Sequence, residues 1–214
     1  MQDIFVQAYR TNLWGDPESA SGQGSGLART AAFRHEIVDL LDRLGARTLL
    51  DAGCGDFNWM KELALSQRYI GWDVVPELIA ANGKYATERR SFVLGDLTSD
   101  VLPEVDVILC RDCLMHFGLA DVWRALLNFR RSGSRYLLTT TFKAHPENAD
   151  IACGDWRTLN LERPPFDFPP PLHEIDEQCL HTGGIYRDKR LALWRMDQIP
   201  DSPALQDDAS FRRP

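Results

Sequence analysis

The stretch Arg47–Asp56, RTLLDAGCGD, decides the fold of this 214-residue chain. A short apolar run, typical of a buried strand, ends in Asp51, and a turn that contains Gly53 and Gly55 follows directly. Glycine has no Cβ, so such a turn brings the backbone close to a small ligand. We expect the next residues, Phe57–Leu63, to begin the first helix. The stretch therefore indicates the strand–turn–helix start of an α/β fold of the nucleotide-binding type.

Two later strand candidates also end in acidic residues. The run Tyr69–Val75 contains Asp73, about where a βαβ unit places the carboxylate that binds a ribose diol. The third run, Ser91–Leu97, contains Asp96. Parallel strands ending in Asp51, Asp73 and Asp96 would place three carboxylates along one edge of a sheet. The alternative is that each acid only caps a helix or polarises a turn.

Four segments carry a resemblance to a known family. Leu50–Gly55 is similar to the first motif of the class I S-adenosylmethionine (SAM)-dependent methyltransferases, and Asp73 to the acid that ends their second strand. Gly95–Leu97 resembles their adenine-side motif, and Asp106–Arg111 their fourth strand. The resemblance covers residues 45–142 well and the flanks loosely. Phe57 stands where a third glycine is usual, and we expect it to alter how the methionine end of the cofactor is covered.

The resemblance also extends, more narrowly, to a bacterial branch of this family. The strings that carry it are Trp14–Asp16, Ser21–Ser25, Cys110–Cys113 and Asp155–Leu161.

The resemblance implies a fold and a cofactor. The fold is a three-layer α/β sandwich with a seven-stranded, mostly parallel, Rossmann-like sheet ordered 3-2-1-4-5-7-6. The last long strand, which includes Leu191–Arg195, is antiparallel. The cofactor is SAM, lying over the glycine turn with its ribose at Asp73 and its adenine near Asp96 and Leu97. The expected cofactor-binding residues are Asp51, Gly53, Gly55, Asp73, Val74, Asp96, Leu97 and Arg111.

The segment Cys110–His116 follows the fourth strand, at the sheet edge where ligands bind in open α/β folds. His116 suits proton transfer near neutral pH, although a structural role is the alternative for a single histidine. Arg111 and Asp112 are further catalytic candidates, or they pair with each other. The two cysteines and His116 are spaced like metal ligands, but no second ligand pair accompanies them, so we expect no metal.

The flanks are expected to supply the substrate side. Residues 1–27 are a lead-in whose Gly/Ser-rich part, 19–26, reads either as a flexible linker or as an ordered lid. Residues 28–214 form the methyltransferase domain, with a proline-rich substrate-side insertion at about 143–185. The expected substrate-binding residues are Trp14, Trp156, Arg157 and Asn160, with Arg157 binding an anionic substituent.

Hydrophobic periodicity predicts further elements. Ala28–Leu44 reads as one helix ended by Gly45, and Leu119–Arg130 as another. Pro76 opens a third helix at a position where proline is tolerated. Tyr136–Phe142 reads as a strand.

Bulk properties exclude several classes of protein. A net charge of −7 and a pI near 5.2 argue against nucleic acid as the main partner. No apolar run approaches the roughly 18 residues of a membrane span, and the start lacks a secretory signal. Five scattered cysteines suit reduced thiols, so we expect a cytoplasmic protein, as a monomer or homodimer.

The function expected from these observations is methyl transfer from SAM to a small-molecule acceptor of metabolite or sugar type. Arg111, Lys143 and Arg157 on the acceptor side hint at an anionic acceptor group. Two alternatives stay open. A nicotinamide-dependent oxidoreductase would have a third glycine in the turn, and a non-catalytic SAM-fold binding protein would have lost residues at the cofactor edge.

Overall fold

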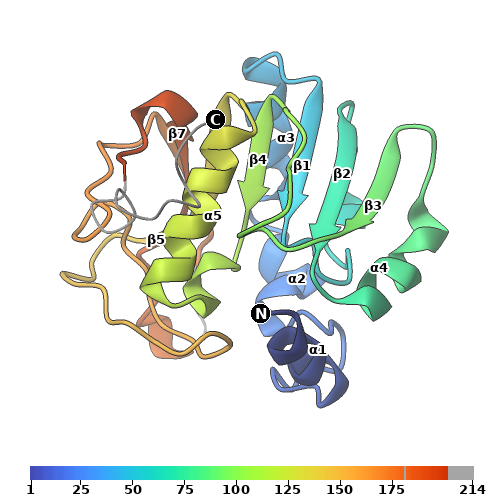
Figure 1. The fold of residues 1–214 in the computed structure, drawn as a ribbon, viewed down its shortest axis with the longest axis horizontal. Coiled ribbons are helices and arrows are strands. Elements are labelled where there is room, and N and C mark those ends of the chain that lie inside the picture. The colour runs from blue at the N-terminus through green and yellow to red at the C-terminus, as the bar shows by residue number, and fades with distance from the viewer. Residues whose placement is uncertain (181, 202–214) are drawn as a thin grey trace.

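The computed structural model describes residues 1–180 and 182–201, and in them seven strands form one sheet ordered β3-β2-β1-β4-β5-β7-β6 (Figure 1). The strands β1 to β5 are parallel to one another, whereas β7 is antiparallel to both β5 and β6. The expected order and the antiparallel last strand are confirmed. The strand bounds are β1 Thr48–Ala52, β2 Arg68–Asp73, β3 Arg90–Leu94, β4 Val107–Cys110, β5 Tyr136–Phe142, β6 His173–Asp176 and β7 Lys189–Arg195.

Helices cover both faces of this sheet. Alternating strand residues separate two cores: Leu49 packs in the cluster of α3 residues, and Leu50 in the cluster of α5 residues. Figure 1 shows α5 in front of the sheet and α3 behind it. The helix α4 packs against β2 and β3. The helix bounds are α1 Gln2–Arg10, α2 Leu27–Thr30, α3 Arg34–Arg43, α4 Pro76–Asn82 and α5 Leu119–Arg131.

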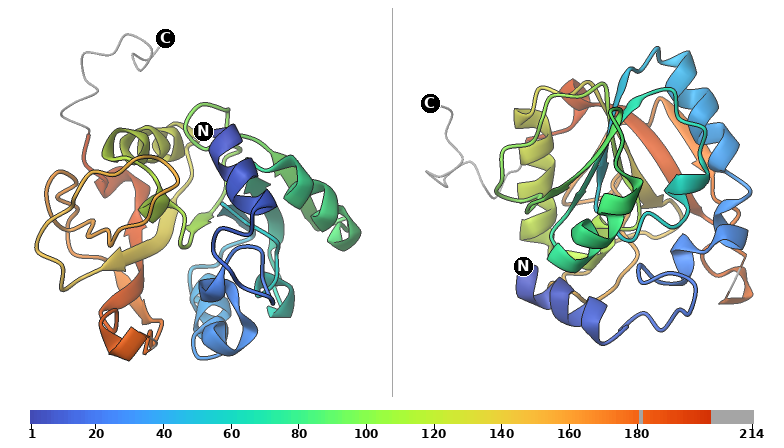
Figure 2. Two further views of the ribbon diagram at one scale, coloured as in Figure 1. Left: turned by 90° about the horizontal axis from the view of Figure 1, so that it is seen from below. Right: turned by 90° about the vertical axis from the view of Figure 1, so that its right-hand side faces the viewer.

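The N-terminal residues lie across one edge of the sheet. In Figure 1 the helix α1 lies beyond the arrowheads of β1, β2 and β4, and Figure 2 shows the same arrangement from two further sides. The carboxyl ends of the parallel strands are the edge where open α/β sheets bind ligands. The chain therefore folds its own N-terminal segment over the edge that the sequence marks as the site.

Two expectations about helices are wrong. The predicted helix Ala28–Leu44 is divided into α2 and α3, because the chain turns at residues 31–33, where the N–H of Phe33 donates to the carbonyl of Thr30 at 3.3 Å. This turn buries the Phe33 ring completely. The segment Phe57–Leu63 forms only a short 3₁₀ turn instead of a first helix.

Phe57 explains the missing helix. Its φ of 59° is in the left-handed region, which an α-helix cannot contain. Its ring is buried against Tyr69, Tyr85 and Phe92, with ring centroids 5.1 to 5.4 Å apart. The side chain therefore lies in the core and not over the glycine turn, where we expected it to affect the cofactor.

Candidate functional site

Three adjoining cavities lie at the carboxyl edge of the sheet, and Ser21 and Asp112 line all three. We call the first, of about 100 Å³ and bordered by the ends of β1, β2 and β4, the strand-end cavity. The second, of about 360 Å³ and walled by four aromatic rings, is the aromatic cavity. The third, of about 50 Å³, lies beside the glycine turn of the first motif (Gly53 to Asp56, also called the first-motif turn below), and we call it the motif cavity.

Asp73 is fixed at the wall of the strand-end cavity by the backbone. Its carboxylate accepts the amide N–H of Gly55 at 2.9 Å and that of Val75 at 3.0 Å. Burial raises the pKa of Asp73, whereas these N–H donors lower it. Apolar side chains that include Leu78 and Leu97 line the same cavity. A fixed carboxylate beside apolar walls suits an adenosyl group, because the acid can accept a diol and the walls can enclose a base.

The glycine turn has no room for side chains. A Cβ at Gly53 would lie 2.8 Å from the Sγ of Cys113, and one at Gly55 would lie 2.0 Å from the Oγ of Ser21. Both glycines also have positive φ values, 85° and 56°, which favour glycine. The expected glycine positions are therefore required by the fold, and Gly53 and Gly55 both line the strand-end cavity.

The other two acids differ in their placement. Asp51 is buried beside the motif cavity and accepts the Tyr69 hydroxyl at 2.6 Å. Burial raises the pKa of Asp51 to about 7. Asp96 lines none of the three cavities; its carboxylate accepts the N–H of Thr98 at 2.8 Å in a local turn. At Asp96 the structure thus shows the turn that we considered as the alternative, whereas the adjacent Leu97 lines the strand-end cavity.

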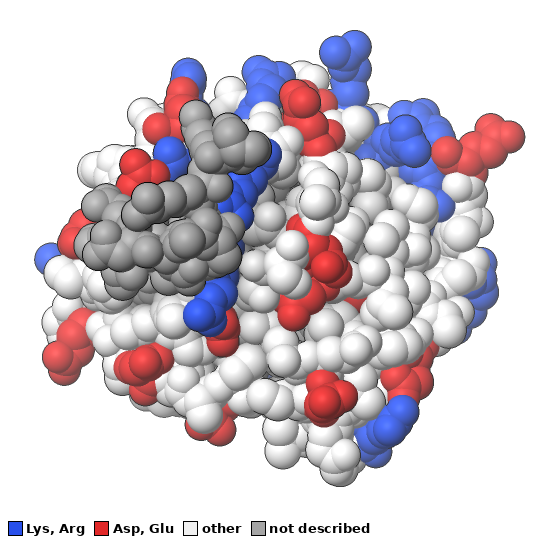
Figure 3. All heavy atoms as spheres, in the orientation of Figure 1, with Lys and Arg blue, Asp and Glu red and all other residues white. Residues whose placement is uncertain are grey.

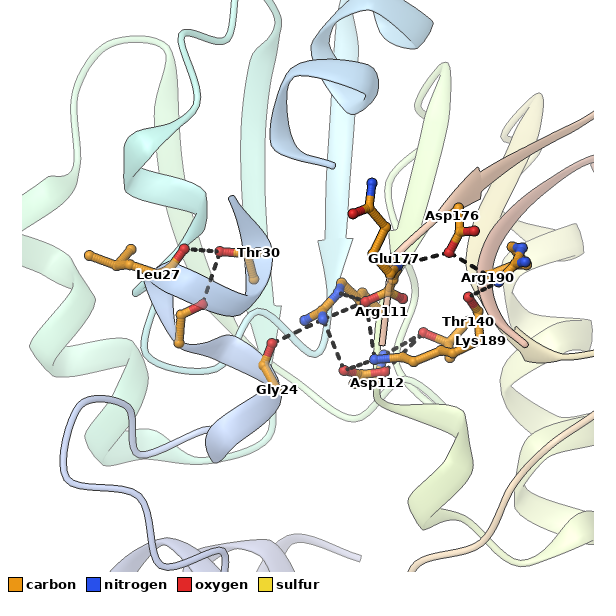
Figure 4. A network of polar contacts seen from close by, with 12 residues as sticks. Gly24, Leu27, Thr30, Arg111, Asp112, Thr140, Asp176, Glu177, Lys189 and Arg190 are labelled. Atoms are coloured by element: carbon orange, nitrogen blue, oxygen red, sulfur yellow. Dashed lines mark hydrogen bonds and ion pairs between the residues drawn. The ribbon is translucent and has the colours of Figure 1, made fainter. Parts of the chain in front are cut away.

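Four charges, of which Arg111, Glu177 and Lys189 are buried and Asp112 is partly exposed, form a closed network after β4 (Figure 4). Arg111 donates through Nη2 to Glu177 at 2.6 Å, and Lys189 lies 2.6 Å from Asp112 and 3.1 Å from Glu177. Asp112 also bonds Thr140 through its backbone N–H and its carboxylate. Burial opposes the ionisation of Asp112, but the two cations outweigh it and hold the pKa of Asp112 well below its usual range.

The sequence does not predict Glu177 and Lys189 as site residues, because no recognisable motif surrounds either of them. Asp112, moreover, has a φ of 51°, in the left-handed region that is strained for a residue other than glycine. The network holds it there. Arg111 and Asp112 therefore contact each other, at 3.3 Å, and they also bind partners from the end of the chain.

The lead-in contacts both the network and the first-motif turn. Arg111 donates to the carbonyl of Gly24 at 3.0 Å. The Asp56 carboxylate accepts the Oγ–H groups of Ser19 and Ser21 and the N–H of Ala20, at 2.9 to 3.2 Å. Residues 19–25 are thus hydrogen-bonded to the site in this structure.

His116 lies where the strand-end and aromatic cavities meet, because it lines both. Its Nδ1 lies 2.9 Å from the carbonyl oxygen of Asp155, which can only accept, so Nδ1 carries the proton and Nε2 carries the lone pair. The Trp14 ring is 5.5 Å from the imidazole. Burial lowers the pKa of His116 below its ordinary value. The histidine is therefore neutral at pH 7, and Nε2 is its acceptor nitrogen.

The expected substrate residues are only partly brought together. Trp14 and Trp156 line the aromatic cavity. Arg157 lines none of the cavities; it donates to the carbonyls of Ala149 and Met115 at 3.0 Å and fixes the insertion to the segment after β4. Asn160 is buried and bonds the carbonyl of His145 at 2.7 Å. The structure thus places the Arg157 and Asn160 side chains in loop packing, outside the lining of the three cavities.

A second cation of the aromatic cavity, besides Lys189, was also not predicted. Arg29 of α2 lines this cavity, although the sequence shows it only as an ordinary polar position in a helix. No pattern in the chain points to it, since its relation to the site depends on the turn between α2 and α3.

Residues 1–180 and 182–201 contain neither a metal-ligand cluster nor a membrane-spanning helix. No group of three or more His, Cys, Asp or Glu side chains in this part could hold a metal ion. No helix there has both the length and the apolar character of a membrane span. On the face drawn in Figure 3, Lys and Arg side chains are dispersed among Asp and Glu side chains.

Comparisons with known proteins agree with this geometry. Residues 50–135 match the family model described as a methyltransferase domain. No curated protein sequence matches significantly. A 1,6-didemethyltoxoflavin-N1-methyltransferase of Burkholderia thailandensis, solved with S-adenosylhomocysteine, is 19% identical with a TM-score of 0.59, over 91% of this chain and 86% of that one.

Two further solved structures share the fold. Human N-acetylserotonin methyltransferase in complex with SAM is 14% identical with a TM-score of 0.53, over 74% of this chain and 50% of that one. Magnesium protoporphyrin IX methyltransferase of Synechocystis PCC 6803 is 18% identical with a TM-score of 0.51, over 67% of this chain and 71% of that one. Residues 50–135 thus match a methyltransferase domain, and the strand order with the glycine turn beside Asp73 gives the chain the fold of the class I SAM-dependent methyltransferases.

Proposed function

We propose that the chain transfers a methyl group to a small-molecule acceptor held in the aromatic cavity, with His116 as the base. The observation that carries this proposal is the position of His116 between the strand-end and aromatic cavities. The three similar solved structures are named for toxoflavin, acetylserotonin and porphyrin substrates, which accords with a small acceptor.

The chain's own residues would hold the cofactor. In this proposal Asp73 accepts the ribose hydroxyls, Val74 and Leu97 enclose the adenine, and Gly53 and Gly55 give the backbone close approach. Asp51, in the motif cavity, faces the amino-acid end. When bound, SAM supplies an electrophilic methyl group whose carbon–sulfur bond breaks with its electron pair left on sulfur.

His116 would take the proton of the group to be methylated. Its Nδ1–H is held by the Asp155 carbonyl, so Nε2 keeps its lone pair, and burial keeps the ring neutral near pH 7. Asp112 is a poor base by comparison, because Lys189 and Arg111 stabilise its charge. We therefore assign Asp112 and Arg111 a positioning role. The lead-in would act as a lid over the two cavities.

The test is a His116→Gln variant, assayed with methyl-labelled SAM and a fractionated metabolite extract as the acceptor source. Loss of the base should lower turnover by about 10²- to 10⁴-fold while the affinity for S-adenosylhomocysteine stays nearly unchanged. The matched control is His35→Gln, because His35 is exposed on α3.

The pH profile gives an independent check. Wild-type kcat/KM should fall with decreasing pH as Nε2 is protonated, with an apparent pKa below the ordinary 6.5 of histidine. Wild-type turnover by the His116→Gln variant would remove His116 from the chemistry.

A further inference from the structure

Arg29 is a cation in the wall of the aromatic cavity, and it has no carboxylate partner in the part of the chain that the structure describes. Its Nη2 donates to the Gln23 side chain at 2.9 Å, while Nη1 is buried and has no hydrogen-bond partner. No ion pair joins Arg29 to a carboxylate among residues 1–180 and 182–201. A buried donor without a partner destabilises a protein. A group from outside the chain would supply the missing partner.

The remaining charges near this cavity cancel. Arg111 and Lys189 face Asp112 and Glu177 in the buried network, two cations against two anions (Figure 4). Lys189 lines the aromatic cavity too, but its ammonium group is already bonded to both carboxylates. Because His116 is neutral, the surplus positive charge of the cavity is that of Arg29.

The walls of the cavity favour a flat ligand. Trp156 lies 5.1 Å from the Tyr186 ring and 6.2 Å from the Phe142 ring, and Trp14 borders the same space beside His116. Aromatic rings of this kind pack well against planar molecules. A volume of about 360 Å³ is within the range of small-ligand sites, so the cavity suits a small aromatic compound.

We infer that the acceptor is a planar aromatic anion whose carboxylate, or a group of like geometry, binds the guanidinium of Arg29. This inference rests on the proposed function, because the group to be methylated must then face His116. It assigns Arg29 the role that the sequence suggested for Arg157. The fork of N–H donors in arginine matches a carboxylate in two-point geometry.

Binding of matched probes tests the inference. The probes are 4-hydroxybenzoate and 6-hydroxy-2-naphthoate, each compared with its neutral amide, on protein saturated with S-adenosylhomocysteine. Calorimetry measures affinity, and tryptophan fluorescence reports occupancy near Trp14 and Trp156. The carboxylates should bind roughly 10- to 100-fold more tightly than their amides, and Arg29→Gln should abolish this preference.

Controls separate charge from folding. Arg29→Lys should restore part of the preference, and Arg68→Gln should keep it, because Arg68 is exposed at the start of β2. Unchanged S-adenosylhomocysteine affinity shows that the Arg29 variants are folded. Equal affinity for acids and amides in the wild type, no binding of either acid, or a preference that survives in Arg29→Gln would overturn the inference. Normal turnover in His116→Gln, with the charge preference intact, would instead overturn only the assigned base.

Discussion

At Asp51 several influences act on one carboxyl group. Burial raises its pKa, the Tyr69 hydroxyl lowers it, and the nearby Asp73 charge raises it further, to about 7 in all. Between about pH 4 and pH 7 the folded protein therefore keeps a proton that the unfolded chain has lost. For this group, the free energy of unfolding falls as the pH rises through that window and stays lower above it.

Asp51→Asn should remove this pH dependence, because the amide cannot ionise but its oxygen still accepts the Tyr69 hydroxyl. At about pH 8 the free energy of unfolding of the ligand-free variant should exceed that of wild type by on the order of 2 to 4 kcal/mol. At about pH 5 this difference should be smaller. Thermal denaturation at several pH values measures this, with Asp39→Asn, exposed on α3, as the control. If the stability difference between Asp51→Asn and wild type does not change with pH, Asp51 is ionised in the folded protein.

At the scale of elements, the lead-in segment is the one whose structure departs most from the flexible linker that its composition suggests. Composition alone suggests a linker for residues 19–26. In the structure, however, the Asp56 carboxylate accepts three hydrogen bonds from Ser19, Ala20 and Ser21. The start of the segment is therefore held by the Asp56 side chain of the glycine turn, while Arg111 holds Gly24.

Asp56→Ala should release this segment while the sheet stays intact. Losing the carboxylate should speed amide exchange in residues 18–25 by roughly 10- to 100-fold, and S-adenosylhomocysteine should slow exchange there in the wild type. Hydrogen-exchange mass spectrometry measures both effects, with Asp39→Ala as the control. Equally rapid exchange in all samples would support the linker interpretation.

The strand elements were predictable from the sequence because their signals are local. An apolar run ending in Asp51 or Asp73 is readable within ten residues, and it locates β1 and β2. The break between α2 and α3 was not readable, since Thr30 and Phe33 fit one helical stripe equally well. The strand β6 was missed because four residues inside a proline-rich insertion give no periodic signal.

At the scale of the whole molecule, the buried charge network joins three distant parts of the chain. Arg111 and Glu177 are 66 residues apart, and Asp112 and Lys189 are 77 apart. Pairings of this kind depend on the sheet order and not on local sequence. For the same reason Arg29 could not be assigned to the acceptor side, and Arg157, which has the right charge in the right insertion, was assigned there instead.

Glu177→Gln should destabilise the whole fold, because it leaves the buried cations Arg111 and Lys189 facing Asp112 alone. Breaking a buried charge network of this kind costs about 3 to 5 kcal/mol, which for a chain of this size lowers Tm by roughly 6 °C or more. Differential scanning calorimetry measures the shift, with the exposed Glu88→Gln as the control. A Tm equal to that of wild type would mean that the network contributes little to stability.

The central claim is that the strand-end cavity binds SAM through Asp73, and calorimetric titration with S-adenosylhomocysteine tests it most directly. Asp73→Ala removes a carboxylate that is fixed by two backbone donors, with Glu88→Ala as the surface control. We expect clear binding by the wild type and the control, and affinity weakened by roughly 30- to 150-fold in Asp73→Ala. Unchanged affinity in Asp73→Ala, or no binding by the wild type, would contradict the account.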